Sequence, residues 1–408
     1  MSQPVSRPPT RGYGRPPFPF GPVIASAGLL LAFGLSLVLV LGRLDLVTTV
    51  APGRPTPAPT VNPSVVFTPP PSAALGYQMK GTILFAKNGD IWSLTSQSVQ
   101  RLTSGGAESE PTWGPGGSTI YYIETRVLDS LTPPQENGGR YDLDYPVITR
   151  MAADGSGAKV IKSGLLTFPG GTHFFDWFLQ PDVSPDGKTI ALITNYPDPF
   201  GLFLGPHLGF LPAGGGTPSV PNLPQFNPLG HNDPAWSPDG KLVAFTYNQR
   251  SGAVGDPRIA IYTVATKRMR FLSAAGYARP SWSPDGQWIA AEKTDGKGRD
   301  IVILNASSGA EVARLTNDGG SFAPTWSPDG TAVAFLHAQG TGIDLDLAVL
   351  GPGSPYSTAQ IIALTESSLL DGTSRPAWFI PPSELPTPVP TVPPASATAS
   401  NGPSPSGP

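Results

Sequence analysis

Few residues of this sequence have the types and spacing that catalysis requires. The four histidines, His173, His207, His231 and His337, lack the spacing of a metal-binding motif. No Gly-x-Ser-x-Gly segment marks a nucleophilic serine, and the chain has no cysteine. The sequence therefore predicts no catalytic residue, no metal and no other cofactor.

A second group of polar residues stands immediately before a proline that recurs along the chain. If these segments converge, their carboxylates and guanidiniums could hold a polar ligand or the end of a peptide. Alternatively, they form ion pairs between neighbouring units and satisfy one another; both interpretations are open. The candidate binding residues are Glu108, Glu110, His231, Asp233, Tyr277, Arg279, Ser321 and Arg375.

A third group is apolar and falls in segments expected to be loops. Exposed apolar side chains in loops are typical of a surface that binds a partner. The alternative is that they pack on the flanks of the fold and cover each other. The candidates are Phe174, Phe175, Trp177, Phe200 and Phe203.

The elements that must position these groups belong to a repeat. Pro-x-Trp-Ser-Pro-Asp-Gly occurs three times in complete form, twice in degenerate form and once truncated to Pro-Ala-Trp. The spacing of about 40 to 50 residues, longer where loops are inserted, is typical of a repeat architecture. The complete copies are Pro234–Gly240, Pro280–Gly286 and Pro324–Gly330; the others are Pro111–Gly117, Pro181–Gly187 and Pro376–Trp378.

Each repeat predicts four short strands. Ser-Pro-Asp-Gly has the composition of a type I turn, and alternating apolar residues follow it. In the unit at Pro280 we expect strands at Ser281–Ser283, Trp288–Glu292, Asp300–Leu304 and Glu311–Leu315. Four hairpin-connected strands per unit are typical of a β-propeller blade, with the first strand lining the central channel.

The count of first strands predicts six blades. The last copy, at Trp378, has no strands after it, whereas Thr82–Ala86, Asp90–Leu94 and Val99–Leu102 precede the first copy. We therefore expect the two ends of the chain to share one blade, which closes the ring without a free edge. The predicted fold is all-β, a six-bladed propeller.

The repeats resemble those of TolB-type, WD40-like β-propellers. The residues that carry the resemblance are Trp236–Gly240, Trp282–Gly286 and Trp326–Gly330, and it covers roughly residues 81–379. It implies a propeller fold but not one activity, since such propellers serve as binding platforms and, in some cases, as lyases. Gly116 in place of Asp and Val183 in place of Trp depart from the pattern.

An apolar segment precedes the repeats. Pro22 to Gly42 carries no charge and is long enough to cross a hydrocarbon core of ~30 Å as a helix. Its length and the lack of a good cleavage site favour an anchor over a cleaved signal peptide. The predicted organisation is a cytoplasmic head at 1–20, a transmembrane helix at 21–43, a Pro-rich linker at 44–80, the propeller at 81–380 and a disordered Pro/Ser/Thr-rich tail at 381–408.

The flanking charges orient this segment. Arg7, Arg11 and Arg15 precede it without any acidic residue between them, which favours an N-terminus inside the cytoplasmic membrane and a propeller outside it. The net charge of −3 and the absence of a basic stripe give no support for nucleic-acid binding. We expect a protein partner in the cell envelope, with a glycan as a further possibility.

Topology assigns the insertions to one face. Loops between second and third strands and between blades lie opposite the Ser-Pro-Asp-Gly turns, and all four long insertions are of these kinds. Loops on a rigid scaffold are where binding function concentrates. The expected function is therefore a non-catalytic, membrane-anchored binding scaffold; the alternatives are a metal-assisted lyase or hydrolase at the channel mouth, favoured if His173, His207 and His231 cluster, or a ligand sensor. The insertions are Arg126–Tyr145, Ser163–Leu179, Asn195–Pro206 and Pro218–Asp233.

Overall fold

A computed structural model describes most of the repeat region. All described residues belong to the compact unit Ser64–Pro408. Within them, no helix is long and apolar enough to cross a membrane, and the predicted span at 21–43 lies outside them, as do Phe200 and Phe203. The described ranges are 77–131, 140–168, 173–198, 205–224, 229–249, 256–351, 356–366 and 368–385.

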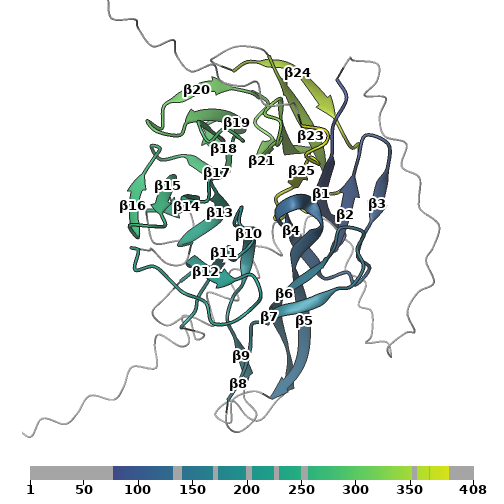
Figure 1. Ribbon diagram of the computed structural model, residues 1–408, viewed down its shortest axis with the longest axis vertical. Coiled ribbons are helices and arrows are strands. Elements are labelled where there is room, and N and C mark those ends of the chain that lie inside the picture. The colour runs from purple at the N-terminus through teal and green to yellow at the C-terminus, as the bar shows by residue number, and fades with distance from the viewer. Residues whose placement is uncertain are drawn as a thin grey trace, which may run out of the picture. The chain divides into compact units, whose positions relative to one another are not determined.

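Six antiparallel sheets stand around a common axis, so the prediction of an all-β, six-bladed propeller is confirmed (Figure 1). Each sheet is one blade, and its first strand lies nearest the axis. The strands are β25 (Ala377–Phe379), β1 (Thr82–Lys87), β2 (Asp90–Leu94) and β3 (Val99–Arg101) in blade 1; β4 (Glu108–Trp113), β5 (Thr119–Leu131), β6 (Arg140–Ala152) and β7 (Lys159–Ser163) in blade 2; and β10 (Leu179–Val183), β11 (Thr189–Thr194) and β12 (His207–Pro212) in blade 3.

The remaining blades contain the complete copies of the repeat. The centres of their second and third strands are buried, and apolar side chains of adjacent blades pack into shared clusters. The strands are β13 (His231–Trp236), β14 (Leu242–Asn248), β15 (Pro257–Thr263) and β16 (Arg268–Phe271) in blade 4; β17 (Tyr277–Trp282), β18 (Trp288–Asp295), β19 (Gly298–Asn305) and β20 (Glu311–Arg314) in blade 5; and β21 (Ser321–Trp326), β22 (Ala332–Gln339), β23 (Gly342–Leu350) and β24 (Thr358–Ala363) in blade 6.

Blade 1 joins the two ends of the chain, as the sequence predicts. β25 pairs with β1, so that Trp378 lies opposite Ile83. Trp378 packs in one cluster with Met79, and Glu384 accepts a hydrogen bond from the main-chain N–H of Gly81 (3.1 Å). The ring is therefore closed by hydrogen bonds between segments some 300 residues apart.

The repeated turn has the geometry that its composition predicts. In the copy at Ser237 the N–H of Gly240 donates to the Ser237 carbonyl (2.9 Å), as in a type I turn. The Ser237 hydroxyl donates to Asp239 (2.7 Å) and accepts from the N–H of Leu242 (2.9 Å). Gly240 has a φ of 69°, in the left-handed region that favours glycine. Ser237, Asp239 and Gly240 thus each make a hydrogen bond or adopt a backbone conformation that favours their residue type.

Two of the expected loops are strands instead. Arg126–Tyr145 is mostly an extension of the β5–β6 hairpin, which stays paired as far as Leu131 and Arg140. Ser163–Leu179 contains a separate hairpin, β8 (Leu165–Thr167) with β9 (His173–Phe175). The expectation of loops was wrong here. Apolar and polar residues alternate in Tyr141–Tyr145, and β9 contains the aromatic residues Phe174 and Phe175; both features favour strands.

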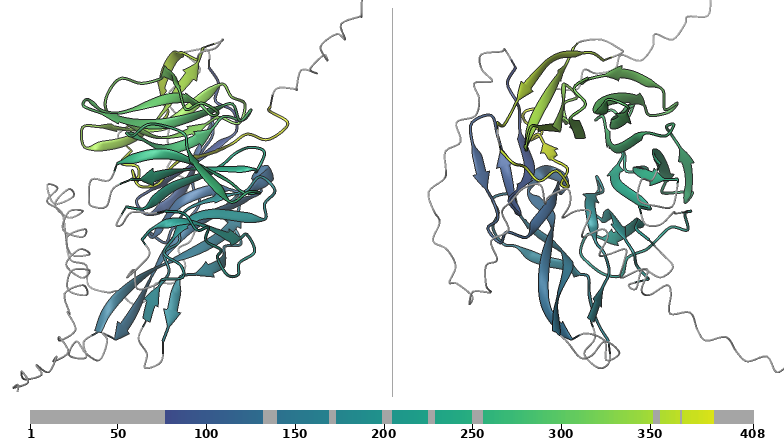
Figure 2. Two further views of the ribbon diagram at one scale, coloured as in Figure 1. Left: turned by 90° about the vertical axis from the view of Figure 1, so that its left-hand side faces the viewer. Right: turned by 180° about the vertical axis from the view of Figure 1, so that it is seen from behind.

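The two hairpins lie side by side and project from the ring (Figures 1 and 2). Gly164 ties them together, since its N–H donates to the carbonyl of Pro146 in β6 (2.9 Å) and its carbonyl accepts from the N–H of Asp176 after β9 (2.9 Å). We call this pair of hairpins, the part of β5–β6 beyond Thr125 together with β8–β9, the arm.

Blade 3 also differs from the expected four strands. Its described residues form three strands, and beyond them only a single bridge joins Phe210 to Ser219. Pro218, Pro221 and Pro224 follow β12 closely. Proline has no N–H to donate, so this segment cannot form a continuous ladder.

Candidate functional site

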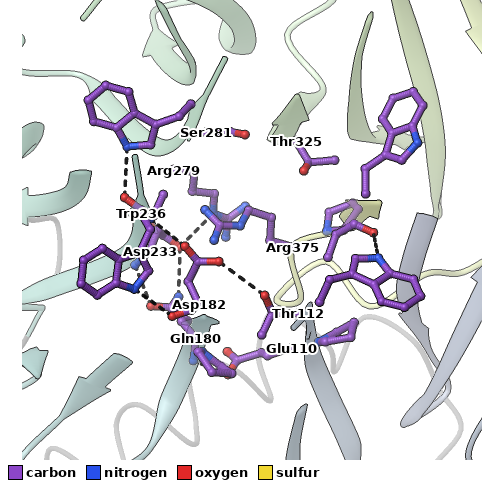
Figure 3. A pocket seen from close by; sticks show the side chains of 18 of the residues that line it. Glu110, Thr112, Gln180, Asp182, Asp233, Trp236, Arg279, Ser281, Thr325 and Arg375 are labelled. Atoms are coloured by element: carbon purple, nitrogen blue, oxygen red, sulfur yellow. Dashed lines mark hydrogen bonds and ion pairs between the residues drawn. The ribbon is translucent and has the colours of Figure 1, made fainter. Parts of the chain in front are cut away.

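The inner strands enclose a cavity of about 270 Å³ on the axis of the ring (Figure 3). Residues of all six blades line it, and most of them come from the segment between the residue before the repeated Pro and the Trp. The polar residues of the lining are Glu110, Thr112, Gln180, Asp182, Asp233, Arg279, Ser281, Ser283, Thr325, Thr373 and Arg375.

A β-bulge in the inner strand points side chains toward this cavity. In β4, β10, β13, β17 and β21 the pairing register shifts around the repeated Pro. The residue before that Pro has a φ of 51–53° in all five strands. A positive φ is uncommon outside glycine, and such residues cluster at functional sites. These residues are Glu110, Gln180, Asp233, Arg279 and Ala323, and the first four line the cavity.

The bulge also frees main-chain N–H groups to bond with the preceding blade. The N–H of Glu110 donates to the Ser374 hydroxyl (2.8 Å), and that of Gln180 donates to Glu110 Oε2 (2.5 Å). The N–H of Asp233 donates to Gln180 Oε1 (2.8 Å), while Gln180 Nε2 donates back to Asp233 Oδ1 (3.0 Å). Side chains around the channel are therefore fixed across the blade boundaries.

Burial keeps two of the carboxyl groups from ionising easily. Desolvation raises the pKa of Glu110 to about 7, and the nearby charges of Asp233 and Asp371 act in the same direction, against Arg375. Burial also raises the pKa of Asp182, although Arg375 and a hydrogen bond from the N–H of Trp236 oppose it. Glu110 therefore changes its charge near neutral pH.

Arg375 crosses the channel and is held there. Its Nη1 donates to the carbonyl of Pro280 (3.0 Å) and its Nη2 to that of Pro234 (3.1 Å), so it links blade 1 to blades 4 and 5. Arg279 is less well satisfied. Its Nη1 is buried without a hydrogen-bond partner; Glu292 Oε2 lies 3.5 Å from it, and Asp233 Oδ1 lies 3.8 Å from Nε.

The eight candidate residues of the channel mouth separate into two groups. Glu110, Asp233, Arg279 and Arg375, each immediately before the Pro, line the cavity. The other four start their inner strands three residues before the Pro and do not line it. They are Glu108, His231, Tyr277 and Ser321.

Each residue of this second group has a partner in the body of the fold. The Tyr277 hydroxyl donates to Glu311 (2.7 Å), and the Ser321 hydroxyl donates to Asp318 (2.8 Å). Glu108 accepts from the N–H of Ala107 (3.2 Å), and burial raises its pKa. Their side chains stabilise their own surroundings, and the cavity does not contain them.

His231 and His207 are likewise tied to the main chain. His231 Nδ1 accepts from the N–H of Leu208 (3.1 Å), and its Nε2 lies 2.9 Å from the Pro224 carbonyl. Burial lowers the pKa of His231 to about 4, so it is neutral at pH 7. Both ring nitrogens of His207 lie within 2.9 Å of carbonyl oxygens. Among the described residues, no group of three or more His, Asp or Glu side chains could hold a metal ion.

The apolar candidates that the structure describes belong to β9 and the segment after it. Phe174 and Phe175 are half-buried in the arm, where Phe174 packs edge-on against Phe168 with ring centroids 5.5 Å apart. Trp177 is half-buried, and its main-chain N–H donates to Asn195 Oδ1 (2.6 Å). Their neighbour Phe178 is fully buried between blades 2 and 3.

The sequence reasoning missed several lining residues. Gln180 stands before Pro181 in the same position as the chosen residues, so the signal was available. Asp182 occupies the position between Pro and Trp where other copies have Thr, Ala or Ser, and a carboxylate there is a departure that could have been noticed. Its Oδ2 accepts from the N–H of Trp236 (2.7 Å) and its Oδ1 from Thr112 (3.4 Å).

Comparison with known proteins agrees on the fold. No protein-family model matches the sequence, and no match was found among curated proteins. Among solved structures, TolB from Acinetobacter baumannii is similar with a TM-score of 0.52 and 18% identity over 75% of this chain and 69% of that one. A structure described as TolB from Agrobacterium tumefaciens has a TM-score of 0.50 and 18% identity over 75% and 96%.

An oligogalacturonate lyase from Vibrio parahaemolyticus is more distant, with a TM-score of 0.41 and 12% identity over 67% of this chain and 89% of that one. At these identities the similarity concerns the fold alone. The six blades, the closure by β25 and the similarity to both TolB structures show that the described chain has a six-bladed β-propeller fold similar to that of TolB.

Proposed function

We propose that this protein is a non-catalytic binding scaffold that holds a protein partner on the face bearing its insertions. The observation that carries the proposal is the arm. Two insertions that could have been irregular loops are paired strands fixed to each other through Gly164. A rigid surface loses little conformational entropy when it binds, which favours affinity.

The arm presents apolar surface. Val127 in β5 has a relative exposure of 61%, the largest among the large apolar side chains that the structure describes. It lies beyond Glu124, the last β5 residue that pairs with β4. An exposed apolar side chain on the arm that also contains half-buried Phe174 and Phe175 suits contact with a protein. A glycan remains the other occupant that the proposal admits.

We further propose that the scaffold is anchored in the cytoplasmic membrane by residues 21–43, with the propeller outside. The support is the length and the uncharged composition of that segment and the arginines before it. Protease accessibility in intact cells tests this placement. Cleavage within the propeller but not within residues 1–20 is the expected result, and protection of both would contradict it.

The docking face is tested by cross-linking in intact membranes with the full-length chain. The test variant is Val127→Asp, and Ile361→Asp on the outer strand of blade 6 is the matched control, since Ile361 is also apolar and 44% exposed. A partner captured by the wild type and by Ile361→Asp, but reduced at least about tenfold with Val127→Asp, is expected from the loss of central apolar contacts. Equal capture by all three proteins would place the docking surface elsewhere.

A further inference from the structure

The cavity on the axis is lined by groups of both charges. Glu110, Asp182 and Asp233 of blades 2, 3 and 4 supply carboxyl groups. Arg279 of blade 5 and Arg375 of blade 1 supply guanidiniums (Figure 3). In a ring of six, blade 2 faces blade 5. The topology therefore places Glu110 across the channel from Arg279.

The charged side chains that line the cavity are held in place before any ligand enters. Glu110 is held by the N–H of Gln180, and Asp182 by Thr112 and the N–H of Trp236. The main-chain N–H of Arg279 donates to the Thr246 hydroxyl (2.9 Å), and the guanidinium of Arg279 lies over the ring of Phe322, 5.4 Å from the centroid. Groups that need no rearrangement bind a charged ligand at a low entropic cost.

Both arginines of the lining retain donor capacity. Arg279 Nη1 is buried without a hydrogen-bond partner, 3.5 Å from Glu292 Oε2, but the side chain as a whole lines the cavity and is 24% exposed. The two bonds of Arg375 to main-chain carbonyls use two of its five N–H donors. An anionic group that enters the cavity therefore finds donors on Arg279 and on Arg375.

We propose that the cavity binds a small zwitterion of dipeptide size, with its ammonium group beside Glu110 and Asp182 and its carboxylate beside Arg279 and Ser281. A cavity of about 270 Å³ is just below the ~300–1,000 Å³ of drug-sized ligand pockets, so it suits a small molecule. A ligand with both charges complements the carboxyl groups and the guanidiniums, and a singly charged ligand complements only one of these kinds of group. The site is separate from the arm and does not depend on the arm binding a protein.

The protonation of Glu110 supplies an independent readout. Burial raises its pKa to about 7, and the other charged groups that act on it are Asp233, Asp371 and Arg375. A bound ammonium group favours the ionised carboxylate. Binding of the zwitterion therefore releases a fraction of a proton near pH 7, which calorimetry in two buffers of different ionisation enthalpy detects.

The test is titration calorimetry with L-alanyl-L-alanine as the probe. The wild type should bind it, and the N-acetylated and C-amidated derivatives should each bind at least about tenfold more weakly, because each has lost one charge–charge hydrogen bond. Arg279→Gln and Asp182→Asn should weaken binding by a similar factor. Lys241→Gln, on an exposed turn outside the cavity, should bind like the wild type.

Three results would overturn the proposal. They are no binding of the dipeptide by the wild type, equal binding of the capped derivatives, and binding without proton release near pH 7. All three are measured on the wild type, so they decide the question even if the cavity variants fail to fold. Loss of partner capture by the arm would leave this result unchanged, which keeps the two proposals distinguishable.

Discussion

In blades 4 to 6 the repeat is complete. Blades 2 and 3 contain its degenerate copies, and the long insertions are in or next to these two blades. Trp236 and Trp282 donate their indole N–H groups to carbonyls of the preceding blade, those of Asp182 and Ala235, at 3.1 Å. Blade 3 has Val183 instead of a Trp, and Asp182 stands beside it, facing the cavity. Trp113 of blade 2 makes the same kind of indole bond, to the carbonyl of Ala377 (3.2 Å). Among the six copies, blade 3 alone therefore lacks the Trp, and Asp182 adds a carboxyl group to the cavity there.

The exposed turns and the buried inner strands shift the pKa values of their carboxyl groups in opposite directions. In the complete copy at Asp239, hydrogen bonds from Ser237 and Lys241 lower the pKa of the exposed carboxyl to about 2. In blade 2, burial raises the pKa of Glu110 to about 7. A turn residue that stays charged supports structure, while a residue that changes its charge at neutral pH can respond to a ligand.

The largest test of this contrast is removal of the wedge side chains. Trp282→Ala should lower the free energy of unfolding by about 3–5 kcal/mol, because it deletes a buried ring and leaves a cavity between blades 4 and 5. Val183→Ala in blade 3 should cost only about 1–2 kcal/mol, since two methyl groups are lost. Urea unfolding of both variants measures the difference. Equal costs would mean that the degenerate blade depends on its inner strand as much as the complete ones.

The pH dependence of stability tests the carboxylate contrast. Glu110 has an unperturbed pKa of 4.5 and a folded-state pKa of about 7. Between these values the folded state binds more protons than the unfolded state, so its stability falls as pH rises. Relative to Glu110→Gln, which cannot titrate, the wild type should lose up to about 3 kcal/mol between pH 4.5 and 7.

Asp239 provides the comparison, because its pKa shift has the opposite sign. Its pKa is lowered from 3.8 to about 2, so its contribution is complete above pH 3.8 and is lost as pH falls toward 2. Asp239→Asn should therefore match the wild type in slope between pH 4.5 and 7. Thermal unfolding across this range measures both variants. A Glu110→Gln protein with the same slope as the wild type would show that the carboxyl is not buried in solution.

The ring could be predicted because its signals are local and repeated. The turn at Ser237 depends on four adjacent residues, and the closing pair of Trp378 with Ile83 follows from counting strands. The candidate site was predicted only in part. The bulge at Asp233 points this residue into the cavity, and His231, two residues earlier, is buried elsewhere. A register shift is set by tertiary pairing, which the spacing of residues does not reveal.

The smallest effect concerns the repeated turn itself. Ser237→Ala removes the hydroxyl that bonds Asp239 and the N–H of Leu242, so it should cost about 1–2 kcal/mol in urea unfolding. Restoring the same serine in blade 2, by Gly114→Ser, should not stabilise the protein. A Cβ at Gly114 would lie 2.2 Å from the Thr119 hydroxyl.

Thr119 thus explains why blade 2 tolerates a degenerate turn. Its hydroxyl occupies the space that the serine side chain fills in complete copies, so the two residues exclude each other. Gly114→Ser combined with Thr119→Ala should therefore be more stable than Gly114→Ser alone. If Gly114→Ser alone stabilised the protein, Thr119 would not exclude the serine. The difference between the complete and the degenerate blades would then not extend to their turns.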